Sequence, residues 1–464
     1  MVDALPARIS LTRRRTVGLA AASVITTLFL VRLLGAGWRE GFPVFFPDSS
    51  SYLQVARLGP FRPSFWFGER PVITPLFLWA GVRNIRVIVL AQSLVYVGAF
   101  WWAIAVMWRI ARTAIGRWSA VVLIVAVAVQ PRFALWNTHV LSESLGISLG
   151  VATIATWLWF VHQPTVGRVT SAWVVTALWA LTRDSNVVVT VTVAVPAALV
   201  AARTWRAVDP AVRRALRTGA LAMGLVLLFV LAGQSASGRN QYPTLNVIGQ
   251  RVLVDDDLTE YYVGLGMPLG DALRERAGRS SFDDGSQFLL DPALDDARMW
   301  AASRGQLAQL SSMVWFAPRF VRTVWDDMPA QVATKHQSYD LFGVGERLPN
   351  ELPFGIDGPA TRMELIAWGL AAVLSLGAMV GSGRRVRHGV LLAIALLATA
   401  GDLYLSWLGD SVEVQRHLVG AIARLGLLLV MIVSSGVDEI VHPGEPAAGP
   451  AAGPAAEPAL EGAP

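Results

Sequence analysis

The sequence predicts an all-α polytopic membrane protein with about ten transmembrane helices and one larger segment inserted on the outer face. Three observations lead to this fold class. The 464 residues are 54% hydrophobic and only 16% charged, with a mean hydropathy of +0.49, which is too apolar for a soluble protein. Many apolar residues form runs of about 18–22, the length with which a helix spans a bilayer. The arginines lie mostly in short loops between these runs.

The first apolar run follows a basic start. Four arginines between residues 8 and 15 precede an apolar run over 17–37. Because no clean small-residue cleavage site follows, we interpret this run as the first transmembrane helix and not as a signal peptide. Residues 38–83 then form a first outer loop, with a short helix over 49–58 and an apolar stretch over 71–79 that is too short to span.

The later runs divide the chain into four units. These are an N-terminal membrane core (1–236), an extracytoplasmic domain (237–361), C-terminal transmembrane helices (362–436) and a Pro/Ala/Gly tail (437–464), whose composition predicts disorder. The extracytoplasmic domain is expected to be mostly helical and to cover the membrane site. The spans after the first are expected at 85–108, 117–130, 143–161, 169–182, 186–202, 218–236, 363–381, 389–408 and 417–435.

The arginines also predict the orientation. With the N-terminus inside, the clusters at 8–15, 109–117, 203–217 and 384–387 all fall on the cytoplasmic side, which satisfies the positive-inside rule and makes both termini cytoplasmic. Lys335 is the only lysine, a bias that indicates a GC-rich bacterial genome, so the expected location is a bacterial plasma membrane. The net charge of +6 follows from this topology and does not indicate nucleic acid.

Acids at the outer ends of spans are the candidate functional residues. Asp48 follows the first span, Glu143 opens the fourth, Asp184 follows the fifth and Glu413 precedes the tenth. Arginines lie at similar depth. A carboxylate can take a proton from a hydroxyl, and a guanidinium can hold a phosphate through two hydrogen bonds, so the set suits a substrate with a sugar and a phosphate. The alternative is that these interfacial charges only face water.

Asp48 has a second interpretation. Asp is a favoured N-cap residue, so Asp48 could cap the predicted helix over 49–58.

Cysteine is absent, which excludes disulfides, thiolate catalysis and Cys-ligated zinc.

Several short motifs resemble the GT-C superfamily of polyprenyl-phosphate-dependent membrane glycosyltransferases. The motifs are Phe46-Pro47-Asp48-Ser49, Leu141-Ser142-Glu143-Ser144-Leu145, Leu181-Thr182-Arg183-Asp184 and the charged run from Glu413 to His417. The resemblance implies transfer of a sugar from a polyprenyl-phosphate donor to a glycan or lipid acceptor of the cell envelope, on the outer face.

The resemblance also implies roles for residues. Asp48 and Glu143 would be catalytic, with Asp48 as the base, and the substrate-binding residues would be Arg183, Asp184, Glu413, Arg416, His417, Tyr52 and His139. Many members carry two acids in the first loop, whereas this chain has Asp48 alone. No metal ligands are therefore predicted, and a divalent cation stays an alternative cofactor.

Two further expectations concern the spans. Asp402 and Arg424 lie at similar depth in an antiparallel helix pair, so we expect a salt bridge, with a structural role favoured over donor binding. The alternative function is a polytopic transporter or a lipid or polysaccharide flippase. In either case the partners include membrane lipids.

Overall fold

The computed structural model describes residues 16, 18–24, 26–27, 45–81, 84–205, 208–239, 241–283, 287–333, 361–383, 385–412 and 414–441. Within these ranges the chain is helical and contains no β-strand, which confirms the predicted all-α class.

Seven helices in these ranges are long and apolar enough to cross a membrane. They are α5 (Ile85–Ile110), α8 (Glu143–His162), the joined helices α10 (Asp184–Val189), η2 (Thr190–Ala194) and α11 (Val195–Thr204), then α12 (Pro210–Ser237), α20 (Arg362–Gly381), α21 (Val386–Gly409) and α22 (Val414–Val441).

The predicted count of about ten spans is not confirmed. An eighth span would require the bent pair of α6 (Ala114–Ala128) with residues 132–138. The third and fifth predicted spans correspond to α6 and α9 (Val166–Ala180), each of 15 residues. Such a helix is about 22 Å long, less than the roughly 30 Å of a bilayer's hydrocarbon core. The first predicted span falls largely outside the described residues.

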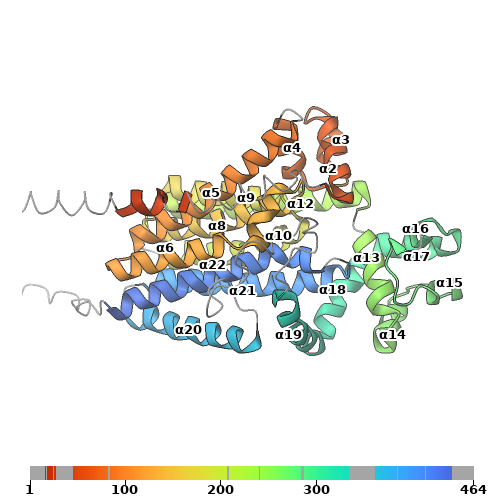
Figure 1. The fold of residues 1–464 in the computed structure, drawn as a ribbon. Helices are drawn as coiled ribbons and strands as arrows, with labels where there is room; N and C mark the ends of the chain where they lie inside the picture. Colours follow the sequence, from red (N-terminus) through yellow and green to blue (C-terminus); the bar gives the residue numbers. More distant parts are fainter. Residues whose placement is uncertain are drawn as a thin grey trace, which may run out of the picture.

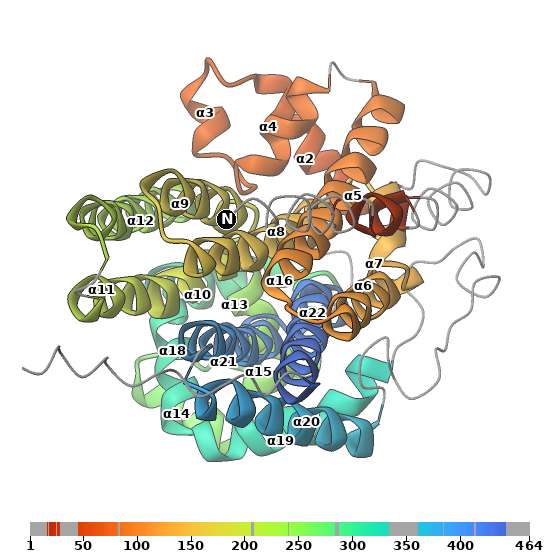
Figure 2. The same cartoon turned by 90° about the vertical axis from the view of Figure 1, so that its left-hand side faces the viewer.

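Helices α8 and α22 form the centre of the bundle. In their apolar windows 78% and 83% of residues are buried inside the protein, against 22% for α12 and 17% for α20. Figure 2 shows α8 and α22 in the middle, with α12 and α20 toward the periphery. A helix that is apolar all round but little buried by protein faces lipid, so α12 and α20 belong to the outer wall of the bundle.

Residues 241–333, which we call the insert, pack at one end of the bundle (Figure 1, right-hand side). We call this end the insert end. The insert has its own apolar core, which includes Leu245, Tyr262 and Phe288. Its longest helices are α14 (Asp256–Gly264), α18 (Gln306–Trp315) and α19 (Ala317–Ala333), and its shorter ones are α13 (Gln241–Val247), η3 (Ile248–Val252), α15 (Asp271–Arg274), α16 (Gln287–Leu290), η5 (Pro292–Leu294), α17 (Asp295–Trp300) and η6 (Ala301–Gly305).

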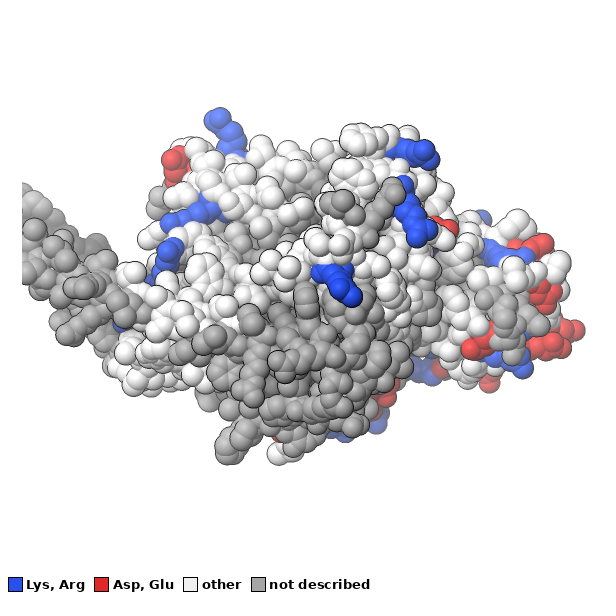
Figure 3. All heavy atoms as spheres, turned by 45° about the horizontal axis from the view of Figure 1, so that its top comes forward, with Lys and Arg blue, Asp and Glu red and all other residues white. Residues whose placement is uncertain are grey.

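The surface charge follows this division. The face seen in Figure 3 is mostly uncharged along the bundle, whereas Asp and Glu side chains gather at its right-hand end, over the insert.

The predicted helical character of the inserted segment is confirmed for the described part. Residues 334–360 of the predicted domain lie outside the described residues.

The first loop is also helical, with α2 (Pro47–Leu58), α3 (Pro63–Trp66) and α4 (Ile73–Ala80) at the insert end (Figure 1). The short connection after α6 consists of α7 (Pro131–Ala134) and the 3₁₀ turn η1 (Leu135–Thr138).

A buried ion-pair network joins three helices at the opposite end. Arg385 Nη2 lies 2.5 Å from Asp438 Oδ2, and Asp438 accepts hydrogen bonds from the backbone N–H of Thr113 (2.7 Å) and Arg112 (2.9 Å). Asp438 is 0% exposed. This corrects the expected tail: residues 437–441 are the last residues of α22 and not disordered, because the acids there pair with Arg385. The rest of the tail, from 442 on, lies outside the described residues.

The network predicts a large cost for a small substitution at Gly116, in the first turn of α6. A Cβ on Gly116 would lie 2.4 Å from Asp438 Oδ1, which its hydrogen bonds hold in place. We expect Gly116→Ala to lower the free energy of unfolding by about 1–3 kcal/mol, the usual cost of overpacking. Gly98→Ala in α5 is the matched control, since a Cβ there meets nothing within 4 Å. Equal unfolding curves for the two variants in detergent would contradict this packing.

Candidate functional site

Four helix starts converge at the insert end, and each places a charged side chain there. Asp48 lies in the first turn of α2, Glu143 is the first residue of α8, Arg183 directly precedes α10, and Arg416 lies in the first turn of α22. The positive end of a helix dipole favours the two carboxylates. It disfavours Arg416, which therefore needs acidic partners at this position.

Arg416 bridges the two carboxylates. Its Nε lies 2.9 Å from Glu143 Oε1, and its Nη2 lies 2.5 Å from Asp48 Oδ2. Arg70, from the loop before α4, places its Nη2 2.6 Å from Asp48 Oδ1. The side chains of Arg416 and Glu143 are 6% and 1% exposed, whereas that of Asp48 is 29% exposed. Arg416 therefore joins Asp48 and Glu143, two of the acids that the sequence places at the outer ends of spans.

Asp48 does not have the capping role that the sequence left open. Helix α2 begins two residues earlier than expected, at Pro47, so the N-cap residue is Phe46. Proline suits the first helical position because its fixed φ matches the helix. The backbone N–H of Phe46 donates to Ser49 Oγ at 2.9 Å, so Ser49 takes part in closing this end of the helix. The Asp48 carboxylate is left to bind the two arginines.

The arginines determine the charge state of Asp48. Burial by itself would raise the pKa of its carboxyl group, but the positive charges of Arg70 and Arg416, together with their hydrogen bonds, outweigh burial and hold the pKa below its usual value. Asp48 is therefore ionised at neutral pH. Burial raises the pKa of the nearby Tyr52 phenol, which stays protonated.

This shift predicts a pH dependence of stability. A carboxyl group with a lowered folded-state pKa stabilises the fold above its unfolded pKa, about 4, and loses that contribution as the pH falls through the folded value. We expect the melting temperature of the wild-type protein to fall below about pH 4 more steeply than that of Asp48→Asn. Thermal unfolding of both proteins between pH 7 and pH 3 measures the difference. Parallel curves would contradict the ion-pair account of Asp48.

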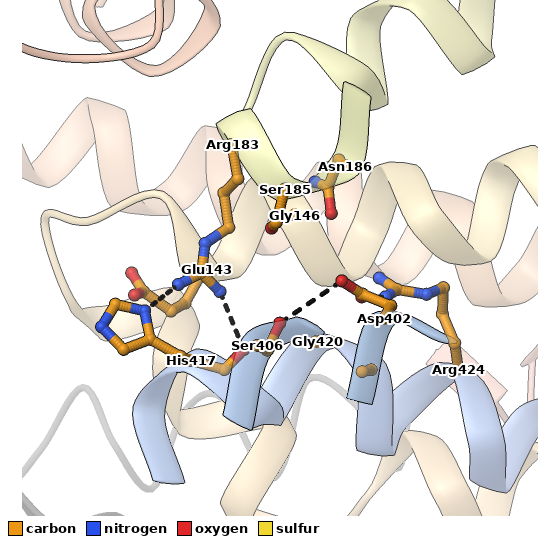
Figure 4. Close-up of a pocket in the computed structure, with 11 residues that line it drawn as sticks. Glu143, Gly146, Arg183, Ser185, Asn186, Asp402, Ser406, His417, Gly420 and Arg424 are labelled. Carbon is orange, nitrogen blue, oxygen red and sulfur yellow. Dashed lines mark hydrogen bonds and ion pairs between the residues drawn. The ribbon is translucent and has the colours of Figure 1, made fainter. Parts of the chain in front are cut away.

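A small cavity lies just beneath these ion pairs. Its lining includes four charged side chains, Glu143, Arg183, Asp402 and Arg424, and the imidazole of His417 (Figure 4). The cavity volume is about 10 Å³, close to what one water molecule requires. Asp48 is not among the lining residues and reaches the cavity through Arg416 and Glu143.

Arg183 is held at the cavity by His417. Its Nη1 donates to the His417 carbonyl oxygen at 3.2 Å, and its Nη2 lies 2.5 Å from His417 Nδ1. Since a guanidinium can only donate, Nδ1 must be the acceptor and the ring proton is on Nε2. That nitrogen lies 3.6 Å from Asp410 Oδ2. Within the described ranges, no carboxylate oxygen lies within ion-pair distance of Arg183.

Asp410 also connects this site to the insert. Asn246 Nδ2 donates to Asp410 Oδ1 at 3.0 Å, and Arg251 reaches the Asp410 carbonyl oxygen at 3.5 Å. Burial lowers the pKa of Arg251 to about 10. The insert therefore contacts the residue that faces His417.

The expected pair of Asp402 and Arg424 is confirmed as a buried salt bridge between α21 and α22. Ser406 Oγ also donates to Asp402 Oδ1 at 3.3 Å (Figure 4). Both charged residues line the cavity. The pair therefore belongs to the site, although its two charges neutralise each other.

The structure places the other candidate residues differently. Tyr52 OH donates to Ser142 Oγ at 3.0 Å, next to Glu143. His139 is buried against Phe46 and Trp136 and does not line the cavity. Glu413 lies outside the described residues.

Asp184 belongs to a different contact. Arg239 binds it through both oxygens, at 2.7 and 2.9 Å, and donates to the Gly68 carbonyl oxygen at 3.0 Å. This pair ties α10 to the end of α12 and to the first loop. We therefore assign Asp184 a structural role and leave it out of the proposed site.

Arg70 is the main site residue that sequence reasoning did not single out. It is 22 residues away from Asp48, and its Cζ also lies 4.9 Å from the centre of the Tyr52 ring. The only signal was its position in the same outer loop as an unpaired acid. In the part of the chain that the structure describes, no group of three or more His, Asp or Glu side chains is arranged to hold a metal ion.

Comparison of the chain with protein-family models found no match, and comparison with curated proteins found none either.

Proposed function

We propose that the protein is a membrane glycosyltransferase that moves a sugar from a polyprenyl-phosphate donor to a glycan or lipid acceptor of the cell envelope. In this proposal the insert end is the outer face of a bacterial plasma membrane. Nucleotide sugars are cytosolic, so an outer-facing site requires a lipid-linked donor. The motifs that resemble GT-C enzymes support the reaction class, since they supply Asp48, Glu143, Arg183 and Arg416 to one cluster.

The observation that carries the proposal is the state of Arg183. Its guanidinium lines the cavity with a neutral imidazole as its partner, whereas Arg416 and Arg424 are both neutralised by acids. Among the residues that the structure describes, Arg183 has no acidic partner, and such a guanidinium can bind a phosphate by donating two hydrogen bonds to it. Arg183 would therefore hold the donor phosphate and stabilise the charge that develops on it as it leaves.

Asp48 would supply the base. As the acceptor oxygen bonds to the anomeric carbon, the bond from that carbon to the donor phosphate oxygen breaks, and the acceptor's hydroxyl proton passes to the carboxylate. Each oxygen of Asp48 already accepts one hydrogen bond from an arginine, and each has a second lone pair for the acceptor hydroxyl. Arg416 keeps Asp48 ionised and fixes its distance from Glu143.

The cavity must widen before a donor can bind. Its volume of about 10 Å³ is too small for a sugar, so this conformation is closed. Asp48 and Arg70, whose side chains are 29% and 25% exposed, both belong to the first loop. Movement of this loop away from α8 and α22 would open the cluster, in the manner of other active-site lids.

The experiment is a panel of radiolabelled polyprenyl-phosphate sugars incubated with the purified protein in proteoliposomes that contain an envelope lipid and glycan extract. We expect at least one donor to lose its sugar to the acceptor fraction, with free polyprenyl phosphate left behind. Complete recovery of every donor with a correctly folded protein would contradict the proposal.

One observation favours the alternative function, a transporter or flippase. Asp402 and Arg424 lie within candidate spans and line the same cavity, as charged residues of a translocation path would. Asp402 is seven residues from the end of α21, about 10 Å along the helix, so the cavity lies nearer the insert end than the centre. Translocation of an intact lipid-linked sugar in the same proteoliposomes would establish the alternative.

A further inference from the structure

An exposed apolar stripe runs along the last two helices of the insert. On α18, Leu307, Leu310 and Val314 recur at intervals of three and four residues and so share one helix face. Val314 is 78% exposed. The stripe continues over the turn into α19, and its six exposed members are Leu307, Leu310, Val314, Trp315, Val321 and Trp325.

The opposite face of α18 is fixed to the bundle. Gln309 Nε2 donates to the carbonyl oxygens of Leu408 (3.0 Å) and Gly409 (3.1 Å), which are the last two residues of α21. Tyr404 OH donates to the Met313 carbonyl oxygen at 2.8 Å. Because these contacts fix the rotation of α18, the stripe cannot turn inward to bury itself.

Helix α19 shows a similar division. Val324 and Met328 are buried in the bundle core, while Arg322 is on the polar side with 86% of its side chain exposed. Val321 and Trp325 are outside the buried set and exposed. The apolar arc of α19 is therefore wider than the part that the bundle covers, and the uncovered part adjoins the stripe on α18.

The stripe lies beside a lipid-facing helix. Arg362, the first residue of α20, donates to Asp326 Oδ1 at 3.0 Å, which places α19 at the insert end of α20 (Figure 1). Only 17% of the apolar window of α20 is buried by protein, and Met363 and Ile366 in its first turns are exposed. The stripe thus continues the apolar wall that the bundle presents to the bilayer.

We infer that α18 and α19 form a membrane-interface element, with the apolar stripe seated in the leaflet at the insert end. Two tryptophans on the stripe suit the headgroup level, where the indole ring is favoured, and Arg322 can reach lipid phosphates. A patch of this kind exposed to water would be costly, and immersion to about 5–10 Å below the headgroups removes that cost. Because α18 is hydrogen-bonded to the end of α21, insertion of the stripe into the leaflet would fix the position of the insert over the residues around Asp410. The inference does not depend on the proposed sugar transfer.

The absence of cysteine makes the test direct. We would place a nitroxide spin label on single-cysteine variants Leu307→Cys, Val314→Cys and Val321→Cys of the full chain in phospholipid nanodiscs. Collision rates would be measured with oxygen, which concentrates in lipid, and with a nickel chelate, which stays in water. Arg322→Cys is the matched control, because it is next to Val321 on the polar side of the same helix.

We expect the oxygen-to-nickel ratio to be several-fold higher at the three stripe positions than at Arg322→Cys, and to fall to the control value in a water-soluble amphipol. Equal ratios at all four positions in nanodiscs would overturn the inference, since the stripe would then face water. Low access to both reagents, with dipolar broadening between labels, would also overturn it by showing that a second copy covers the stripe. Three stripe positions keep the test valid if one variant folds poorly.

Discussion

Asp48→Asn is expected to fold and insert normally but to transfer sugar about 10²–10⁴-fold more slowly than the wild-type protein, the usual effect of losing a general base. Asparagine has nearly the same shape, and its amide oxygen can still accept a hydrogen bond from one of the two arginines. It cannot take the proton of the acceptor hydroxyl. The measurement is the initial rate of transfer from the accepted donor, with the melting temperature recorded on the same preparation.

Asp184→Asn is the matched control for this variant. Asp184 is also a first-turn carboxylate paired with an arginine, and its side chain is 25% exposed, close to the 29% of Asp48. We expect Asp184→Asn to lose some stability and keep its transfer rate. If both variants transfer at the wild-type rate, Asp48 is only an ion-pair partner and its assignment as the base is wrong.

Arg416→Met should give the largest loss of stability at the site. It leaves Glu143, whose side chain is 1% exposed, without its ion-pair partner. Removing one partner of a buried pair costs about 3–5 kcal/mol, because the remaining charge stays desolvated. The measurement is the free energy of unfolding in detergent. The double variant Arg416→Met with Glu143→Gln should be more stable than the sum of the single effects predicts, since no uncompensated charge is left.

Arg70→Met is the control for Arg416→Met. Both arginines bind Asp48, but the Arg70 side chain is 25% exposed, so we expect a loss of at most about 1 kcal/mol. Losses of similar size for the two variants would show that burial does not determine the strength of this network, contrary to our account.

The sequence predicted the site best where a charge occurs at the end of an apolar run. Asp48, Glu143, Arg183 and Arg416 all lie at helix starts, and in a chain of antiparallel spans every second span starts on the same side of the membrane. Their convergence therefore follows from topology alone. The pair Asp402 and Arg424 was predictable for the same reason, since equal offsets from a turn give equal depth and unpaired charges there are costly.

The rest depended on packing that the sequence does not specify. Arg70 pairs with Asp48 because α2 and α4 fold back on each other, and Asp184 pairs with Arg239 because α12 ends beside α10. Neither contact leaves a periodic signal. Asp438 has the polarity of a tail residue and is nevertheless buried, since Arg385 neutralises it. The number of spans was uncertain because run length cannot separate a 15-residue helix packed by protein, such as α6, from a full span.

The most direct test of the central claim follows the fate of the accepted donor in sealed proteoliposomes of known orientation, with the label in both the sugar and the prenyl chain. The account predicts that the two labels separate: the sugar appears on the acceptor at the insert end, and polyprenyl phosphate stays in the membrane. Movement of both labels together to the opposite leaflet, with no transfer, would contradict it and identify the protein as a carrier of lipid-linked sugars.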